Sequence, residues 1–437
     1  MDEACTYLKR PLKHDGPVEP DVVDRVSDML LDIEHGGMDA IRKWSLELDG
    51  WDPPSFLVTD SEIAAARERV VPDFCEAFAL AMENVAEFAR LQRATLVDAE
   101  WEPKPGVIVG QRQIPIDKVG SYLPGGRYPL VSSPLMSVLV PKVAGVGSVV
   151  TCTPPIPVAA RISDHAVDPA MVYATDACGA DAIFSIGGVP ALAAMTFGIE
   201  GLTPVDIVCG AGNQYVAEAK RQLFGRVGID LLAGPSEVAV ICDETADPEL
   251  VAADLLGQAE HGPNSPAYLV TTDEAIGRRI LVEIERQLPL LRTRSVAEAA
   301  WRDYGLAVLC QSRDEAVRVA DEIACEHLEV HTADDAWYHA RLRNYGSLFL
   351  GERATVAYSD KGLTGTNHTL PTRRTARYTG GLSVAKFLKT VTYQRIETDD
   401  ATKQIAPAVI WFDRMDMLHG HERTAAIRLE RAGGTVP

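Results

Sequence analysis

The sequence predicts an α/β protein in which helices cover parallel β-sheets. Between residues 107 and 381, short runs rich in β-branched residues alternate with helical stretches, which is typical of parallel strands joined by crossover helices. The segments 22–48 and 60–91 instead place apolar residues at helical spacing. A chain of 437 residues is also too long for one small core. We therefore expect two α/β units, with smaller helical parts at the two ends of the chain.

The expected strands are separated by enough residues to leave a helix between successive strands. They are residues 146–153 (VGSVVTCT), 182–188 (AIFSIGG), 205–212 (VDIVCGAG), 237–244 (EVAVICDE) and 267–273 (AYLVTTD). Upstream, the segment WDPPSF at 51–56 separates two helices, because proline ends or kinks a helix. Beyond residue 382 the pattern returns to mixed helix and ends in a polar helical segment, 413–431.

Composition and charge narrow the class of protein. Acidic residues outnumber basic ones by 62 to 42, a net charge of −20, which argues against nucleic acid or an anionic membrane as a partner. The eight cysteines are scattered singly, without a CxxC pair, so we expect reduced thiols rather than a disulfide framework or a cysteine zinc site. The N-terminal residues lack the apolar run of a secretory signal. We expect a cytoplasmic enzyme.

Two segments carry side chains suited to metal binding or proton transfer. Gln258 and His261 lie three residues apart on an expected helix, so both side chains can face one ion. The alternative for His261 is a structural or solvated histidine near a helix end. Glu326 and His327 are adjacent and can serve as an acid/base pair, because the pKa values of both are tunable toward neutrality. The alternative for this pair is surface charge after a helix.

Two further segments gather histidines with other polar residues. The loop 359–372 (SDKGLTGTNHTLPT) offers Asp360 and His368 as candidate ligands, since functional loops are rich in such donors and acceptors. An ordinary capped turn would look similar. In 418–428 (LHGHERTAAIR), His419 and His421 open a helical stretch, for which a solvated helix end is the alternative.

Two glycine-rich segments, 120–129 (GSYLPGGRYP) and 210–220 (GAGNQYVAEAK), follow or flank expected strands. The second is similar to the start of a dinucleotide-binding loop, in which helical N–H groups hold a pyrophosphate. It lacks the full glycine fingerprint and an evident acidic residue at the end of the following strand. By itself it is a weak indication of a cofactor site.

Taken together and in this order, these segments resemble histidinol dehydrogenase. The resemblance runs from about residue 25 to the end, through GSYLPGGRYPLVSSPLM, GAGNQYVAEAKRQ, LLAGPSEVAVICDE, VAADLLGQAEHGPNSPA, CEHLEV, TGTNHTLPT and GLSVAKF. It implies two incomplete Rossmann-like domains plus small N- and C-terminal helical domains. The implied ranges are an N-terminal arm (1–22), a first Rossmann-like domain with the zinc and catalytic residues (23–121 and 236–381), a second one on the NAD side (122–235), and a swapped tail domain (382–437).

The resemblance also implies a reaction and a zinc site. The family oxidises a primary alcohol to a carboxylate through an aldehyde held in the site, using two NAD molecules in turn. It binds Zn²⁺ through residues that match Gln258, His261, Asp360 and His421. By the same resemblance, His327 removes the hydroxyl proton and Glu326 activates the water of the second step.

For the cofactor, Tyr122 and Asn213 match positions that contact NAD in the family. The family assembles as an intertwined homodimer, in which the tail of one chain, and so His421, would complete the site of the partner chain.

Three differences from the family fall at functional positions. Pro190 stands where a cofactor-contacting glutamine is expected, and proline has no side-chain amide. Asp416 replaces a substrate-contacting glutamate and is shorter by one methylene. Lys361 replaces an aromatic residue directly after the zinc aspartate. The expected substrate contacts are Ser236, His368, Asp416, His419, Lys361, Arg373 and Arg374, with Arg377 and Arg127 as further nearby cations.

These differences favour an anionic substrate over histidinol, which is a cation. Guanidinium and ammonium groups are the usual partners of sulfonate, phosphate and carboxylate. The pattern is similar to the sulfopropanediol 3-dehydrogenase branch of the family, which oxidises (R)-2,3-dihydroxypropane-1-sulfonate to 3-sulfolactate. One alternative is oxidation of L-histidinol to L-histidine; another is a zinc-binding homologue without catalysis. The cations would then be exposed residues that pair with the acidic surface.

Overall fold

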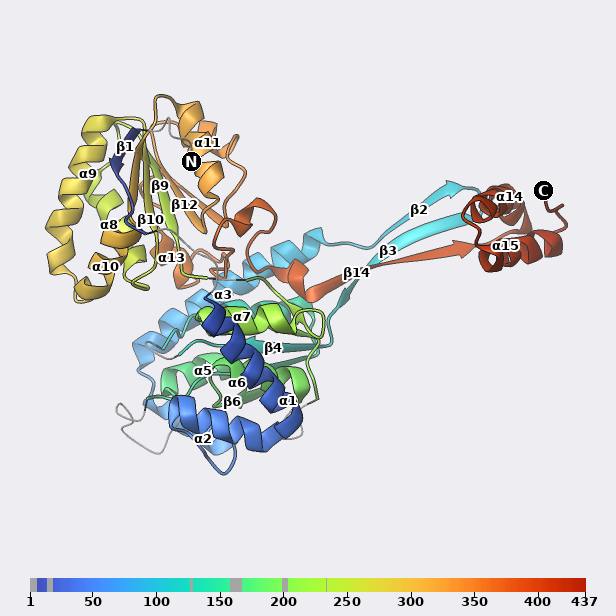
Figure 1. Ribbon diagram of the computed structural model, residues 1–437, viewed down its shortest axis with the longest axis horizontal. Helices are drawn as coiled ribbons and strands as arrows, with labels where there is room; N and C mark the ends of the chain where they lie inside the picture. The colour runs from blue at the N-terminus through green and yellow to red at the C-terminus, as the bar shows by residue number, and fades with distance from the viewer. Residues whose placement is uncertain (1–5, 14–18, 126–128, 158–166, 199–202, 233) are drawn as a thin grey trace. The chain divides into compact units, whose positions relative to one another are not determined.

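The computed structural model describes residues 6–13, 19–125, 129–157, 167–198, 203–232 and 234–437, so Arg127 lies outside the described residues. The chain divides into two compact units (Figure 1): residues 1–91 with 116–387, and residues 92–115 with 388–437. The first unit contains two largely parallel sheets covered by helices. The predicted α/β class is confirmed.

A six-stranded sheet carries the C-terminal half of the first unit. All neighbouring strands are parallel except β1, which runs antiparallel to β11. The strand order is β1 (Thr6–Lys9), β11 (Leu306–Leu309), β10 (Ala267–Thr271), β9 (Val238–Cys242), β12 (His327–His331) and β13 (Ser347–Leu350). The associated helices are α8 (Pro248–Ala259), α9 (Glu274–Gln287), α10 (Arg294–Tyr304), α11 (Arg313–Ile323), α12 (Asp335–His339) and α13 (Val356–Asp360).

Strand β9 shows why this sheet is covered on both faces. Val238 and Val240 belong to the core formed with α8 and α9. Ala239 and Ile241 point the other way and belong to the core formed with α11. Since successive side chains of a strand alternate between faces, a strand that is apolar throughout needs helices on both sides.

The second sheet of the first unit has five parallel strands. Their order is β6 (Ala182–Phe184), β5 (Ser148–Cys152), β4 (Lys118–Tyr122), β7 (Ile207–Cys209) and β8 (Gly228–Ile229). The helices of this part are α1 (Pro20–Asp49), α2 (Asp60–Arg69), α3 (Pro72–Thr95), α4 (Val140–Ala144), α5 (Pro169–Ala177), α6 (Gly188–Phe197) and α7 (Gln214–Leu223), with a π-helical turn at Leu135–Leu139.

The N-terminal helix α1 differs from the expected domain ranges. These ranges group residues 23–121 with the zinc-bearing domain, whereas α1 packs against α6 and α7 beside the five-stranded sheet. Its apolar stripe, with Val26 and Ile33, shares a core with Leu192 and Val216. A helical stripe shows only that one face is buried. It does not show which sheet will cover that face.

The second unit is a three-stranded antiparallel sheet with a helical pair. The sheet order is β14 (Leu388–Ile396), β3 (Val107–Pro115) and β2 (Ala99–Lys104). Helices α14 (Asp399–Met415) and α15 (His419–Arg431) pack through a small core that includes Ile410 and Leu429. The expected tail range, 382–437, begins near the observed one and contains the residues of β14, although no strand is predicted there, and it leaves out the β2–β3 pair. Strand β14 is mostly exposed, so it lacks the buried apolar face on which a strand prediction depends.

Among the described residues, no helix is both long enough and apolar enough to cross a membrane.

Candidate active site

Strand β12 divides its side chains between the core and a polar face. Leu328 and Val330 are buried in the core on the α11 side. Because strand side chains alternate, His327, Glu329 and His331 lie on the opposite face, and all three are buried. This face is the one that α8 and α13 cover: Glu329 accepts a hydrogen bond from the first residue of α13.

The backbone of Glu237, just before β9, fixes the Glu326–His327 pair. Its N–H donates to Glu326 Oε2 at 2.9 Å, and its carbonyl oxygen lies 2.9 Å from His327 Nδ1. A carbonyl can only accept, so Nδ1 carries the hydrogen. The other ring nitrogen, Nε2, is buried and makes no hydrogen bond to any residue that the structure describes. In its neutral form His327 therefore carries a lone pair on Nε2, as a general base requires.

The charges around His327 and its burial shift the pKa of this ring in opposite directions. Burial lowers the pKa of this ring, but the Glu326 carboxylate, 3.4 Å from Nδ1, and the Glu237 carbonyl raise it by more. The net result is a His327 pKa raised to about 9. A divalent cation close by would counteract the field of Glu326 and bring this pKa back toward neutrality.

Asp360, the last residue of α13, lies at the centre of a group of histidines. Burial raises the pKa of its carboxyl, but the positive fields of His368, Lys361, His261 and His327 outweigh burial and lower it. His368 is anchored to the same residue, through Nδ1 and the Asp360 carbonyl oxygen at 2.8 Å. The structure thus brings together predicted site residues that are far apart in the sequence.

The end of α8 supplies the other two predicted zinc ligands of the first unit. Gln258 is buried, and its Nε2 atom has no hydrogen-bond partner among the described residues. The backbone N–H of His261 bonds to the Gln258 carbonyl at 3.2 Å, which holds the two residues in one turn while the imidazole stays exposed. A buried amide without a partner, one carboxylate and nearby imidazoles form a nitrogen and oxygen donor set that suits Zn²⁺.

The remaining predicted ligand and two substrate residues lie on the second unit. His421 and His419 belong to the first turn of α15, and Asp416 follows α14 directly. All three are exposed within that unit. Their expected approach to Asp360 stays a prediction.

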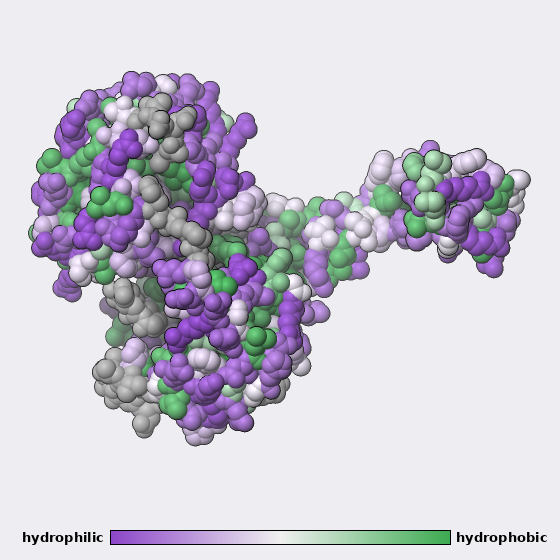
Figure 2. All heavy atoms as spheres, in the orientation of Figure 1, coloured by the Kyte–Doolittle hydropathy of each residue, from purple (hydrophilic) through white to green (hydrophobic). Residues whose placement is uncertain are grey.

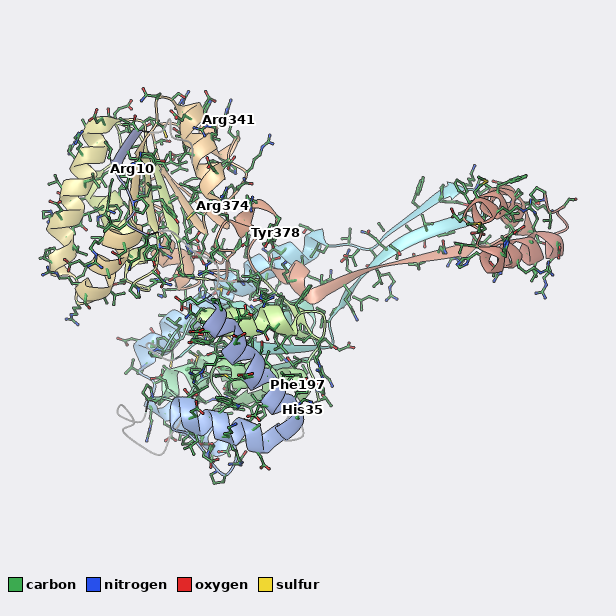
Figure 3. All side chains as sticks on the ribbon, in the orientation of Figure 1. Arg10, His35, Phe197, Arg341, Arg374 and Tyr378 are labelled. Atoms are coloured by element: carbon green, nitrogen blue, oxygen red, sulfur yellow. The ribbon has the colours of Figure 1, made fainter. Side chains whose placement is uncertain are left out.

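The predicted substrate cations differ in how they are held. Lys361 Nζ lies 3.5 Å from Asp360 Oδ2 on a side chain that is 60% exposed. The backbone N–H of Arg373 donates to Glu237 Oε1 at 2.7 Å, which ties Arg373 to the residue after Ser236. Arg374, labelled with Tyr378 in Figure 3, is exposed. Arg373 and Arg374 both have positive φ angles, 53° and 64°. Residues whose backbone is held in this strained region are often found at functional sites.

The predicted cofactor residues border the five-stranded sheet. Tyr122, at the end of β4, is buried and its hydroxyl accepts from the Gly188 N–H at 3.2 Å, while Pro190 occupies the first turn of α6, where no N–H is needed. Asn213 caps α7 through Oδ1. Gly210, with φ +112°, has no room for a side chain, since a Cβ would lie 2.1 Å from the Tyr122 carbonyl oxygen.

Sequence reasoning missed a second polar group beside this site. Asp254 on α8 lies with Glu329 and His331 in a group whose ligand-type atoms are all within 4.8 Å of one another. The available signal was the alternation His327, Glu329, His331 in β12, which places three ionisable residues on one face of a strand.

Comparison with known proteins agrees with the fold and with these site segments. The family model for histidinol dehydrogenase matches residues 13–429. A histidinol dehydrogenase homolog from Shouchella clausii is 47% identical over 413 residues, which is 94% of this chain and 95% of that protein. The sulfopropanediol 3-dehydrogenase of Ruegeria pomeroyi is 45% identical over 427 residues, 97% of this chain and 96% of that protein.

A solved structure gives the same result. The crystal structure of histidinol dehydrogenase from Elizabethkingia anophelis matches with a TM-score of 0.90 and 32% identity, covering 97% of this chain and 95% of that chain. Agreement over almost the whole length, in sequence and in structure, shows that this chain belongs to the histidinol dehydrogenase family.

Proposed function

We propose that this oxidoreductase catalyses the zinc-dependent, NAD-linked oxidation of a primary alcohol to a carboxylate through a held aldehyde. The observation that carries the proposal is the buried, unpartnered Nε2 of His327, close enough to Asp360 for each to shift the pKa of the other. Per alcohol, the oxidation consumes one water and two NAD⁺ and yields the carboxylate, two NADH and three protons.

The side chains of the site support these steps. When bound, zinc polarises the oxygen on the reacting carbon and NAD takes up the hydride. Gln258, His261 and Asp360 are the first-unit residues that would hold the metal. His327 Nε2 accepts the hydroxyl proton while Nδ1–H stays on the Glu237 carbonyl. Glu326, fixed by the Glu237 N–H, activates the water that adds to the aldehyde.

For NAD, we propose that the amide of Asn213 and the N-terminus of α7 contact the cofactor. The Asn213 Oδ1 atom already accepts from the N–H groups of Tyr215 and Val216, so its NH₂ group is the one directed to a ligand. The N–H of the first residue of α7 and the positive end of the helix dipole favour a phosphate. Pro190 supplies shape but no hydrogen bond, so recognition relies on the backbone around Gly188.

For the substrate, we propose (R)-2,3-dihydroxypropane-1-sulfonate, oxidised to 3-sulfolactate. Lys361 lies beside the Asp360 carboxylate, and Arg373 is anchored next to Ser236. Both are suited to a sulfonate, and the sulfopropanediol 3-dehydrogenase of Ruegeria pomeroyi supports the same choice. L-Histidinol is the second candidate, because the solved relative with this fold is a histidinol dehydrogenase.

A substrate panel tests this choice. We expect kcat/KM for the sulfonated diol to exceed that for L-histidinol by about a hundredfold or more, because a cationic substrate would be repelled by Lys361 and Arg373. NADH release, followed by its absorbance, should reach two per molecule of diol. The variant Lys361→Gln should raise KM for the sulfonate with little change in kcat. Faster turnover of L-histidinol would instead identify the histidine reaction.

We also propose a homodimer in which the tail of one chain completes the site of the other. His421 lies on the second unit and is exposed there. The same unit carries large apolar side chains that are 46–79% exposed, namely Trp411, Phe412, Met415, Met417 and Leu418. Figure 2 shows hydrophobic residues at the surface of this unit. An exposed apolar patch of this kind usually marks an interface with another chain.

Mixing two inactive variants tests the shared site. Dimers formed from equal amounts of His327→Asn and His421→Asn chains should recover about one quarter of the wild-type rate. Half of the dimers are then mixed, and each mixed dimer has one intact site. If each chain used its own His421, every site would carry a lesion and the mixture would stay inactive. Wild-type protein carried through the same mixing procedure is the control.

A further inference from the structure

A buried polar group outside the catalytic pair connects the elements of the proposed zinc site. His331 Nε2 lies 3.3 Å from Glu329 Oε2 and 3.9 Å from Asp254 Oδ2, and the three side chains are 1%, 0% and 15% exposed. Both nitrogens of His331 and Glu329 Oε2 lack a hydrogen bond to any described residue. Such a group is costly to bury unless its members stabilise one another.

The two carboxylates use their remaining oxygens to hold α13. Asp254 Oδ1 accepts from the Thr355 hydroxyl at 2.9 Å, and Glu329 Oε1 accepts from the Val356 N–H at 3.1 Å. Thr355 is the N-cap of α13, and its hydroxyl oxygen accepts from the Ala357 N–H. A helix of five residues is not stable alone. Its start is fixed here by two carboxylates: Glu329 accepts from a free N–H of the first turn, and Asp254 holds the hydroxyl of the N-cap residue.

The same group connects the three elements that supply the site. Asp254 lies one turn before Gln258 on α8, so both face the same side. Glu329 lies two residues after His327 on the same face of β12. Helix α13 begins at the carboxylate contacts and ends at Asp360. A change at the group therefore displaces a predicted metal ligand or the catalytic histidine.

The members of this group shift one another's pKa values toward the protonated forms. Burial and the neighbouring Glu329 carboxylate raise the pKa of Asp254 to about 7. Burial lowers the pKa of His331, but its contact with Glu329 outweighs burial and raises it. Both shifts favour the protonated form, which lowers the net negative charge of the group.

We propose that Asp254, Glu329 and Thr355 are positioning residues that set the spacing of the zinc ligands Gln258 and Asp360 and of the catalytic His327. The inference rests on the proposed function. Residues that hydrogen-bond to the elements carrying metal ligands contribute to metal affinity because they fix the ligands before the metal binds.

Zinc affinity of the full-length protein, measured by competition with a chromophoric chelator, tests this role. Asp254→Asn and Thr355→Val should each weaken zinc binding by about ten- to a hundredfold. Thr355→Ser keeps the hydroxyl and should bind zinc as the wild type does. The control is Asp303→Asn, which replaces a carboxylate bonded to Arg302 and Lys13 away from this group. It should leave zinc affinity unchanged.

The outcomes separate this role from its alternatives. Variants that melt at lower temperature but bind zinc with wild-type affinity would reduce the group to a structural contact and overturn the inference. Two zinc ions per wild-type chain, falling to one in Asp254→Asn, would also overturn it, because the group would then bind a metal itself. Wild-type protein that binds no zinc would overturn the proposed function, and this inference with it.

Discussion

Replacing His327 with asparagine is expected to lower kcat by about a hundred- to ten-thousandfold, the usual contribution of a positioned general base. The asparagine amide can still donate to the Glu237 carbonyl, so the local backbone should be retained. What the variant lacks is the acceptor at Nε2. Steady-state kinetics on the accepted alcohol measure the loss, and KM and zinc content should change little.

The dependence of the reaction rate on pH tests the same role of His327. His327 must be neutral to accept a proton, so the wild-type rate should rise with pH as the ring loses its proton. The midpoint of this rise should lie below pH 9. The Glu326 carboxylate raises the His327 pKa to about 9, and a metal bound near Asp360 would counteract that field. The variant His327→Asn should lack this rise in rate with pH. The control variant His339→Asn, which replaces an exposed histidine on α12, should keep it. Undiminished turnover in His327→Asn would exclude the proton-transfer role.

Removing the metal is expected to abolish activity, by at least about a hundredfold, since polarisation of the substrate oxygen contributes several kcal/mol to the transition state. Dialysis against a chelator followed by readdition of Zn²⁺ should show loss and recovery. Asp360→Asn should give the same loss without dialysis, because an amide is a weaker ligand than a carboxylate.

The control for metal removal is again Asp303→Asn, an acid-to-amide change at a residue that the site does not use. It should respond to the chelator and to zinc as the wild type does. Adding zinc should raise the thermal unfolding temperature of the wild type, and it should raise that of Asp360→Asn by less. A fully active protein that contains no metal would reject the zinc site.

The sequence predicts part of the two sheets but no strand for β1, β4, β8, β11 and β13. The five expected strand segments contain β5, β6, β7, β9 and β10, because these strands are apolar runs bounded by turn residues. Strand β12 was not predicted. Its sequence HLEVH alternates polar and apolar residues as a half-exposed strand would, but it is buried on both faces. Only the packing of α8 and α13 over its polar face accounts for this.

The candidate site was predictable in parts. The spacing of Gln258 and His261 predicts that both lie on one helix, but α8 ends at Ala259, and His261 lies in the turn that follows, held by the hydrogen bond of its N–H to the Gln258 carbonyl. Their proximity to Asp360, far along the chain, depends on the order of strands in the sheet, which spacing does not encode. The family resemblance supplied that pairing. Neither spacing nor resemblance indicated the contacts of Asp254 with Thr355.

The alternation of β12 has a consequence for how this chain can vary. Leu328 and Val330 belong to the core, whereas His327, Glu329 and His331 belong to the polar face. Inserting or deleting a single residue near the start of the strand would exchange these two sets. The Glu329 carboxylate and the two imidazoles would enter the hydrocarbon interior, and the leucine and valine would face the proposed zinc site. Length changes in homologues should therefore accumulate in loops away from this strand, while side-chain replacements within it stay confined to alternate positions.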